Sequence, residues 1–262
     1  MPSLRQEIES FAKRVVYAKA RTARGIAVVP DPPPHMAFIG NPGTGKTTIA
    51  RIMAEILHFL ELTRSSKLTE VQRSDLIGQY VGQTEKVTRS VIEKSKGGVL
   101  FVDEAYRLTP RDSTKYYGQC AVEELMKEME IHDPVMIFAG YPKEMKQFFD
   151  SNAGLYRRIP LVLNFPDYSR EELGKILQSV LIQNQYHVDD DSSIEEAIGQ
   201  LQDQQIACMN AGICQLIFQK ARDSLINRLD PLDFMSADLN IFSKNDVITA
   251  ARSLPTIPVG RL

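Results

Sequence analysis

The sequence predicts an α/β protein in which a parallel-sheet core is followed by a helical C-terminal part. Three observations favour this fold class. A glycine-rich turn joins an apolar strand to an amphipathic helix within residues 35–60, four apolar residues at 99–102 end in two carboxylates, and helical patterns replace strand patterns beyond residue 168. Consecutive apolar residues suit a strand that is buried on both faces, as in a parallel sheet with helices on either side.

The first 167 residues begin with a basic amphipathic helix at 3–24, whose apolar side we expect to comprise Ile8, Phe11, Val15, Val16 and Ala18. We prefer a helix packed on the core, with a solvated basic face, to a membrane or nucleic-acid arm. The prolines at 30 and 32–34 mark residues 28–34 as a linker, because proline cannot continue a helix.

Strands and helices then alternate along the chain. We expect strands at these places: 35–39, 68–72, 99–102, 135–139 and 161–165. We expect helices at 48–60, 84–96 and 121–130, with the second stopped by Gly97-Gly98. The apolar face of the first of these helices is expected to comprise Ile49, Ile52, Met53, Ile56, Leu57 and Leu60.

The C-terminal part is predicted to be all-helical. We expect helices at 169–184, 191–204, 210–228 and 243–253, the second capped near Asp191 or Ser192 and the fourth starting at Ser243 with Asp246 three residues on. The chain is therefore expected to have two domains, a nucleotide-binding α/β core at 1–167 and a helical lid at 168–262.

Composition narrows the class of function. The 262 residues are 43% hydrophobic and 24% charged, with a formal net charge of −2, which argues against a general electrostatic grip on nucleic acid or anionic membrane. Three cysteines without a CxxC pair favour a reducing compartment, and four scattered histidines argue against a metal cluster. With neither a membrane-length apolar run nor a signal-peptide core visible, we expect a cytoplasmic or organelle-stromal protein.

The turn after the first strand fits the P-loop pattern in full: Gly40, four residues, then Gly45-Lys46-Thr47. Glycines let backbone N–H groups and the helix N-terminus point at phosphates, while Lys46 adds a positive charge and Thr47 a hydroxyl for Mg²⁺. The competing interpretation is an ordinary strand–turn–helix. The pattern predicts ATP and Mg²⁺ as ligands.

Two carboxylates, Asp103 and Glu104, follow the buried run at 99–102, where ligands bind in open α/β sheets. A P-loop in the same chain needs such a pair. Asp103 would hold the Mg²⁺ shell, and Glu104 would orient and deprotonate the attacking water. The alternative is a strand that ends in a solvated acidic turn.

Several stretches together closely resemble the CbbX/SpoVK-type clade of AAA+ ATPases, which includes red-type rubisco activases. They are HMAFIGNPGTGKTTIARIMAEIL, LIGQYVGQT, GGVLFVDEAY, IFAGYPKEMKQFF, RRIPLVLNFPDYS and NRL at 227–229. The resemblance spans residues 3 to 253. It implies a ring-forming ATPase, usually hexameric, that remodels a protein by pulling a segment of it into a central pore.

The resemblance also implies residue roles. Its phosphate loop matches Gly40, Pro42, Gly43, Thr44, Gly45, Lys46, Thr47 and Thr48. Tyr80 and Val81 match the aromatic–aliphatic pore loop that grips a threaded chain. The alternative interpretation is a tyrosine that packs against its own domain. Arg158 matches the arginine finger that reaches a neighbour's γ-phosphate. The alternative interpretation is an ordinary surface arginine.

The chain departs from the clade in three places. Tyr156 stands where relatives usually have another arginine two residues before the finger. Gly212 and Gln215 replace the lid cations called sensor 2, and the nearest lid cations, Lys220 and Arg222, lie more than a helical turn further on. The chain also begins where the clade has a Gly-Leu turn that lines the adenine pocket, which leaves open that it is a fragment of a longer protein.

The leading interpretation is an enzyme, a competent ATPase motor subunit, and the altered lid contact leaves its rate of hydrolysis open. The alternative is a weakly active or regulatory nucleotide-binding subunit of a mixed ring. A DNA-directed AAA+ protein would call for a basic recognition helix or an appended DNA-binding domain, and neither is visible at a net charge of −2. A metabolic kinase would need an acceptor site and an arginine-rich lid, and the GQYVG loop argues against it. The expected partners are subunits of the same kind in a ring and a protein client, without nucleic acid or membrane.

Overall fold

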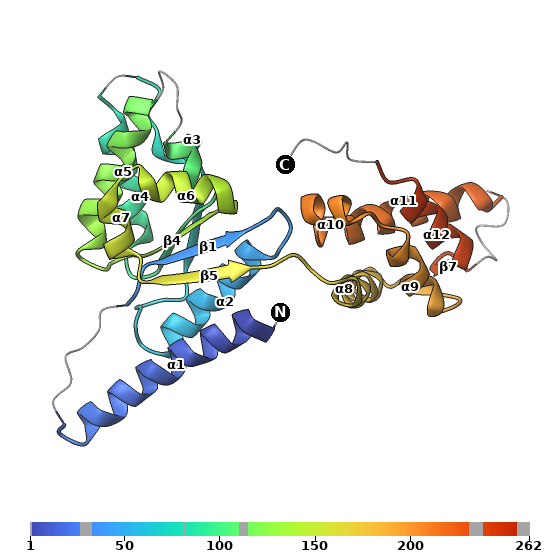
Figure 1. Ribbon diagram of the computed structural model, residues 1–262, viewed down its shortest axis with the longest axis horizontal. Coiled ribbons are helices and arrows are strands. Elements are labelled where there is room, and N and C mark those ends of the chain that lie inside the picture. The colour runs from blue at the N-terminus through green and yellow to red at the C-terminus, as the bar shows by residue number, and fades with distance from the viewer. Residues whose placement is uncertain (1, 27–32, 81, 110–114, 231–237, 256–262) are drawn as a thin grey trace. The chain divides into compact units, whose positions relative to one another are not determined.

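The computed structural model describes residues 2–26, 33–80, 82–109, 115–230 and 238–255. It divides into two compact units (Figure 1). The first contains Met1–Gly40 and Gly45–Phe165, and the second contains Asn41–Thr44 and Pro166–Leu262. Each unit has a hydrophobic core of its own.

The first unit is built on a five-stranded parallel sheet, as the sequence predicted. Its strands are β1 (Met36–Gly40), β2 (Leu68–Val71), β3 (Val99–Val102), β4 (Val135–Gly140) and β5 (Leu161–Phe165), in the order β2-β3-β4-β1-β5. Every residue of β3 and β4 is buried, which confirms the expectation of strands covered on both faces.

Helices cover both faces of this sheet (Figure 1). One face carries α1 (Pro2–Ala23) and α2 (Lys46–Phe59), against which Val99 and Phe101 of β3 pack. The other face receives Leu100 and Val102. The elements on that face are α3 (Arg73–Leu76), α4 (Thr84–Ser95), the 3-10 helix η1 (Ala105–Leu108), α5 (Lys115–Met129), α6 (Pro142–Asp150) and α7 (Ala153–Arg158).

Some details of the first unit differ from the sequence prediction. Val16 of α1 and Ile52 of α2 are 55% and 43% exposed rather than inward, and the buried face of α2 instead includes Ala50 and Ala54. The short helices α3, η1, α6 and α7 were not predicted. Most of the expected linker, residues 27–32, lies outside the described residues.

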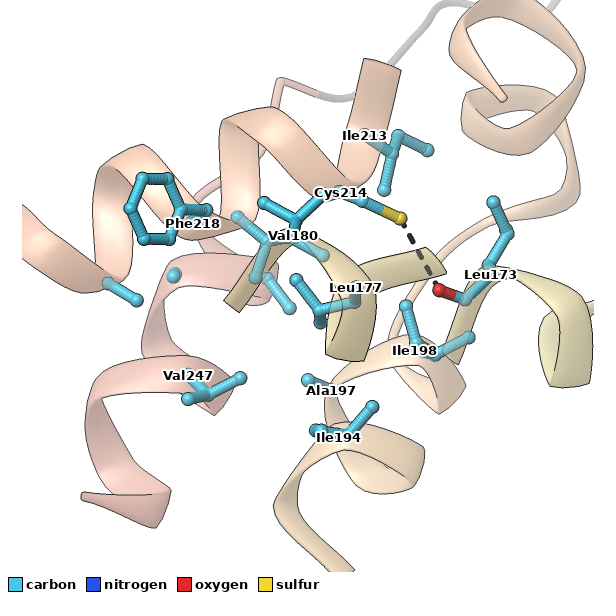
Figure 2. Packing of buried hydrophobic residues seen from close by; sticks show 14 of the residues in the cluster. Leu173, Leu177, Val180, Ile194, Ala197, Ile198, Ile213, Cys214, Phe218 and Val247 are labelled. Carbon is cyan, nitrogen blue, oxygen red and sulfur yellow. Dashed lines mark hydrogen bonds between the residues drawn. The ribbon is translucent and has the colours of Figure 1, made fainter. Parts of the chain in front are cut away.

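The second unit is mainly helical. Its helices are α8 (Arg170–Gln183), α9 (Ser192–Gly199), α10 (Asp203–Met209), α11 (Gly212–Arg228) and α12 (Lys244–Arg252). Their apolar side chains interdigitate in one core, part of which Figure 2 shows around Leu177 and Ile198. Buried Cys214 donates a hydrogen bond to the Leu173 carbonyl oxygen at 3.4 Å, and burial raises the pKa of this thiol to about 12.

Two predictions for the second unit were wrong. The helix expected at 191–204 is split, because Gln202 is extended and begins α10 with a capping box to Gln205. The second unit is also not all-helical, since β6 (His187–Val188) and β7 (Ile241–Phe242) form a two-stranded parallel sheet. The cap at Ser243 is confirmed: its Oγ accepts a hydrogen bond from the Asp246 N–H. No helix within the described residues has the length and apolar character that a bilayer crossing requires.

Candidate nucleotide-binding site

The chain turns sharply between β1 and α2. Gly43 and Gly45 have φ values of 71° and 87°, a left-handed conformation that favours glycine because a Cβ atom would be strained there. Gly45 is the N-cap of α2, so the unpaired N–H groups of the first helical turn and the positive end of the helix dipole lie at the end of this loop. Such a loop is suited to an anion such as phosphate.

Lys46 is the first residue of α2, and its ammonium group is partly buried. Its Nζ donates a hydrogen bond to the Gly40 carbonyl oxygen at 2.8 Å and lies 5.5 Å from the centre of the Tyr141 ring. Burial lowers the pKa of Lys46, whereas the carboxylates of Asp103 and Glu104 act to raise it. The lysine is therefore held within the electrostatic reach of both acidic residues.

Asp103 and Glu104 follow β3 directly, and only β4 separates β3 from β1 in the sheet. Because these strands are parallel, their carboxyl ends share one edge, which brings both acids to the same edge as Lys46. The Asp103 N–H donates to the Val71 carbonyl oxygen at 2.9 Å. Burial raises the pKa of Asp103, opposed by the hydrogen bond that its carboxylate accepts from the Glu104 N–H and by the charge of Lys46.

Three side chains surround the Glu104 carboxylate. Its Oε1 accepts hydrogen bonds from the hydroxyls of Tyr106 at 2.9 Å and Tyr141 at 3.3 Å, and its Oε2 lies 3.0 Å from Nε of Arg107. The backbone of Glu104 is left-handed, with φ 48° and ψ 44°, a conformation that costs a non-glycine residue roughly 1–3 kcal/mol. Tyr106 and Arg107 were not found from the sequence, and the motif Asp-Glu-Ala-Tyr was the only signal available.

The oxygen groups at this edge fit a hard cation. Thr47, in the first turn of α2, supplies a hydroxyl and is partly exposed, and Asp103 supplies a carboxylate. Mg²⁺ prefers oxygen ligands of this kind and usually keeps waters and substrate phosphates in its shell. Pro42 is partly exposed and Thr48 exposed in the same segment. The donor set therefore fits Mg²⁺ held together with a nucleotide.

Arg158 lies away from these groups, at the end of α7. It precedes Leu161, whose partner in the register is Met36 at the amino end of β1, whereas Phe165 pairs with Gly40 at the carboxyl end. The length of β5, about 13 Å, therefore separates Arg158 from the edge that carries the phosphate loop. Within its own chain the guanidinium forms an ion pair with Glu130 and donates to the Gly154 carbonyl oxygen at 3.2 Å.

Tyr80 lies in the segment between α3 and α4, and 69% of its surface is exposed. It is therefore not a packed core residue. Val81, the second residue of the predicted pore loop, lies outside the described residues. Gly78 is confined, because a Cβ there would come within 2.6 Å of the Gln83 Cβ, so the base of this segment requires glycine.

The second unit holds the amino-terminal half of the phosphate loop, residues 41–44, through a buried asparagine that sequence reasoning missed. Asn210 donates from Nδ2 to the Pro42 carbonyl oxygen at 3.1 Å and to Asp167 Oδ1 at 2.9 Å. The next residue, Ala211, donates its N–H to the Gly43 carbonyl oxygen at 3.2 Å. The carbonyl groups of Pro42 and Gly43 are thus satisfied by residues 210 and 211.

Gly212 and Gln215, which stand at the sensor 2 positions, are both exposed in the first turn of α11. A Cβ added at Gly212 would meet no atom within 4 Å. The cations further along behave as surface groups: Arg222 lies over the Phe218 ring at 6.0 Å, and Lys220 is partly exposed.

These features define a class of protein, the P-loop ATPase of the AAA type. Residues 36–163 match the family model described as ATPase family associated with various cellular activities (AAA). Solved structures share the fold at low sequence identity. The AAA domain of FIGL-1 has a TM-score of 0.66 at 19% identity, covering 96% of this chain and 82% of that one. The RuvB Holliday junction branch migration motor of Thermotoga maritima has a TM-score of 0.56 at 18% identity, covering 93% and 68%.

Within that class the chain belongs to the CbbX family. It is 40% identical to Protein CbbX of Cereibacter sphaeroides, over 86% of this chain and 74% of the relative. It is 44% identical to the chromosomal Protein CbxX of Cupriavidus necator and 42% identical to the chloroplastic ribulose bisphosphate carboxylase/oxygenase activase of Cyanidioschyzon merolae, over 72% of this chain in both cases. The chain spans 60% and 64% of the length of these last two relatives.

Proposed function

We propose that this chain is an ATP-hydrolysing subunit of a ring, usually a hexamer in this clade, that remodels a protein client. One observation carries the proposal. Lys46, Asp103 and Glu104 gather at the carboxyl edge of the sheet, while Arg158 lies at the amino edge, beyond β5. This arrangement supports a hydrolytic site that Arg158 of a neighbouring subunit completes.

The phosphate loop is the binding element in this proposal. N–H groups of the loop and of the first turn of α2 bind the β- and γ-phosphates of ATP, and Lys46 neutralises part of their charge. Thr47 and Asp103 would hold Mg²⁺, which when bound offsets phosphate charge.

Glu104 is proposed to act on the attacking water. Its carboxylate accepts the proton of a water aligned with the γ-phosphorus, and the new oxygen–phosphorus bond forms as the bond to the β-phosphate oxygen breaks. The products are ADP and inorganic phosphate. Arg158 of the next subunit would stabilise the charge that develops on the transferred group.

Tyr80 and Val81 are proposed to grip the client. An exposed aromatic ring can contact any backbone or side chain, which suits a grip that does not depend on sequence. The name of the relative from Cyanidioschyzon merolae makes rubisco the first client to test. Trapping clients on a Glu104→Gln variant and identifying them by mass spectrometry would name others.

A second function, that of a regulatory subunit, is supported by the uncharged residues Gly212 and Gln215 at the sensor 2 positions. With no cation at either place, the chain would bind ATP but turn over slowly, as a regulatory subunit beside an intact homologue. Turnover by the isolated chain separates the two functions, because only the motor subunit hydrolyses ATP by itself.

The test uses two variants with matched controls. Lys46→Ala should lose binding of a fluorescent ATP analogue, since the loop alone cannot neutralise the phosphates, while Lys175→Ala on the surface of α8 should bind normally. Glu104→Gln should bind but not hydrolyse, whereas Glu93→Gln should do both. Normal binding by Lys46→Ala would refute the proposed phosphate loop, and unchanged turnover by Glu104→Gln would refute the proposed base.

A further inference from the structure

The carboxylate of Glu104 has two oxygens in different surroundings. Oε1 accepts two phenolic hydrogen bonds, from Tyr106 at 2.9 Å and Tyr141 at 3.3 Å. Oε2 faces the guanidinium of Arg107, with Nε at 3.0 Å. The side chain of Glu104 is 20% exposed and that of Arg107 58% exposed, so the group that covers Oε2 is itself largely in contact with solvent.

The Tyr106 ring is fixed in place by packing. Its centre lies 5.5 Å from that of Tyr141, and a Cβ atom on Gly140 would come within 2.8 Å of its Cδ1. Glycine at the end of β4 therefore makes room for this ring. Ala105 and Leu108 of η1 are fully buried, so the short helix that carries Tyr106 is anchored in the core.

The Arg107 contact is weaker than the tyrosine contacts. The Arg107 side chain is 58% exposed, so water solvates its charge and the long side chain loses freedom when it pairs with Glu104. Two hydroxyls held by packing lose little freedom when they bind Oε1. The carboxylate is therefore held firmly at Oε1 and only loosely covered at Oε2.

We propose that Tyr106, with Tyr141, is a positioning residue that fixes Glu104 through Oε1, and that Arg107 covers Oε2 until the attacking water takes its place. This inference rests on the proposed function of Glu104. The division of roles follows from the geometry: an oxygen that already accepts two hydrogen bonds has no free lone pair for a water, whereas Oε2 does. Arg107 occupies one of the two acceptor sites of Oε2 and so competes with the water there.

The two roles predict effects of different size on hydrolysis. Tyr106→Phe keeps the ring and removes the hydroxyl, so the carboxylate gains freedom and kcat should fall about tenfold while KM for ATP stays within twofold. Tyr141→Phe should act in the same direction. Arg107→Gln should raise kcat, by up to about fivefold, because it removes the group that competes with the water for Oε2. Tyr186→Phe, whose ring stacks on Phe242 in the second unit, serves as the hydroxyl control.

A purely structural role for Tyr106 would give another pattern. If the ring mattered only for packing, Tyr106→Phe would match the wild type in kcat and only Tyr106→Leu would be impaired; that outcome would overturn the inference. A kcat that is unchanged or lower in Arg107→Gln would overturn it as well. Melting temperatures of all variants, and their binding of a fluorescent ATP analogue, show whether each is folded and binds nucleotide.

Failure of this inference differs from failure of the proposed function. Glu104→Gln is assayed in the same series. If that variant keeps wild-type turnover, Glu104 is not the base and the proposed function is wrong whatever the tyrosine variants do. If it loses turnover and Tyr106→Phe does not, only the positioning role is wrong.

Discussion

Arg158 forms an ion pair with Glu130 of its own chain, and its buried Nε has no hydrogen-bond partner among the described residues. Both residues precede strands, β5 and β4, and so lie at the amino edge of the sheet. An arginine that acts on a neighbour's phosphate has to leave this partner. In the proposed ring, Glu130 would therefore compete with the neighbouring subunit for the guanidinium.

Glu130→Gln should raise turnover per subunit at protein concentrations where assembly is incomplete. The gain is expected to be at most about fivefold, because Glu130 is largely exposed and such pairs are worth about 0–1 kcal/mol. Steady-state ATPase assays across a protein dilution series measure this. Glu93→Gln, which breaks a surface pair with Lys96, is the control. A large fall in turnover would mean instead that Glu130 holds Arg158 in its active position.

Gln215→Arg and Gly212→Arg should raise turnover or tighten ATP binding, since each adds a cation at a position where the resemblance to the clade implies one. Both positions are exposed, and Gly212 has open space for a side chain. Replacing glycine in the first turn of α11 should also add about 1 kcal/mol of stability through helix propensity. Unchanged ATP affinity and turnover in both variants would show that the lid does not act through these positions.

Tyr80→Ala should leave ATP binding and the melting temperature unchanged while client remodelling is lost. The reason is that 69% of the Tyr80 surface is exposed, so little packing is removed. Thermal denaturation and a client-remodelling assay measure the two effects, with Tyr156→Ala, an exposed tyrosine on α7, for comparison. A drop of many degrees would assign Tyr80 to packing.

His35 should make the protein less stable in acid. Its ring is fully buried, accepts a hydrogen bond from the Met136 N–H, bonds the Met129 carbonyl oxygen and stacks on His132; burial lowers its pKa to about 4. The unfolded chain then binds the proton more readily than the folded one below pH 6.5. The free energy of unfolding should therefore be about 3 kcal/mol lower at pH 4 than it is above pH 6.5.

Urea denaturation of the wild type and of His35→Gln between pH 7 and 4 measures this loss. The variant cannot titrate at this position, so its stability should depend less on pH than that of the wild type. His58→Gln, on the exposed side of α2, should keep the wild-type dependence. Parallel curves for wild type and His35→Gln would assign the acid sensitivity to other groups.

The sequence predicted the sheet well because β3 and β4 are buried on both faces, and continuous apolar runs then stand out. It missed β6 and β7 because two-residue strands show no alternation. The break before α10 was missed because Gln202 is neither glycine nor proline, although it starts a new helix.

The phosphate loop and the acidic pair were predictable because they are local motifs. The surroundings of Glu104 were not, since Tyr141 comes from another strand end, 37 residues away along the chain. Asn210 is similar: its partner Pro42 lies 168 residues earlier, and only the folded chain brings the two together.

The central claim, a hydrolytic site completed by a neighbour's Arg158, is tested most directly by mixing two inactive variants. Arg158→Ala should bind ATP but hydrolyse it about 10³-fold more slowly, and Lys46→Ala should not bind it. Mixed and shown to co-assemble by fluorescence energy transfer, the two should recover part of the wild-type ATPase rate, because an Arg158→Ala subunit keeps Lys46 and can use the arginine of a Lys46→Ala neighbour. Co-assembled mixtures without recovered activity, or wild-type turnover per subunit that does not change with protein concentration, would contradict a shared active site.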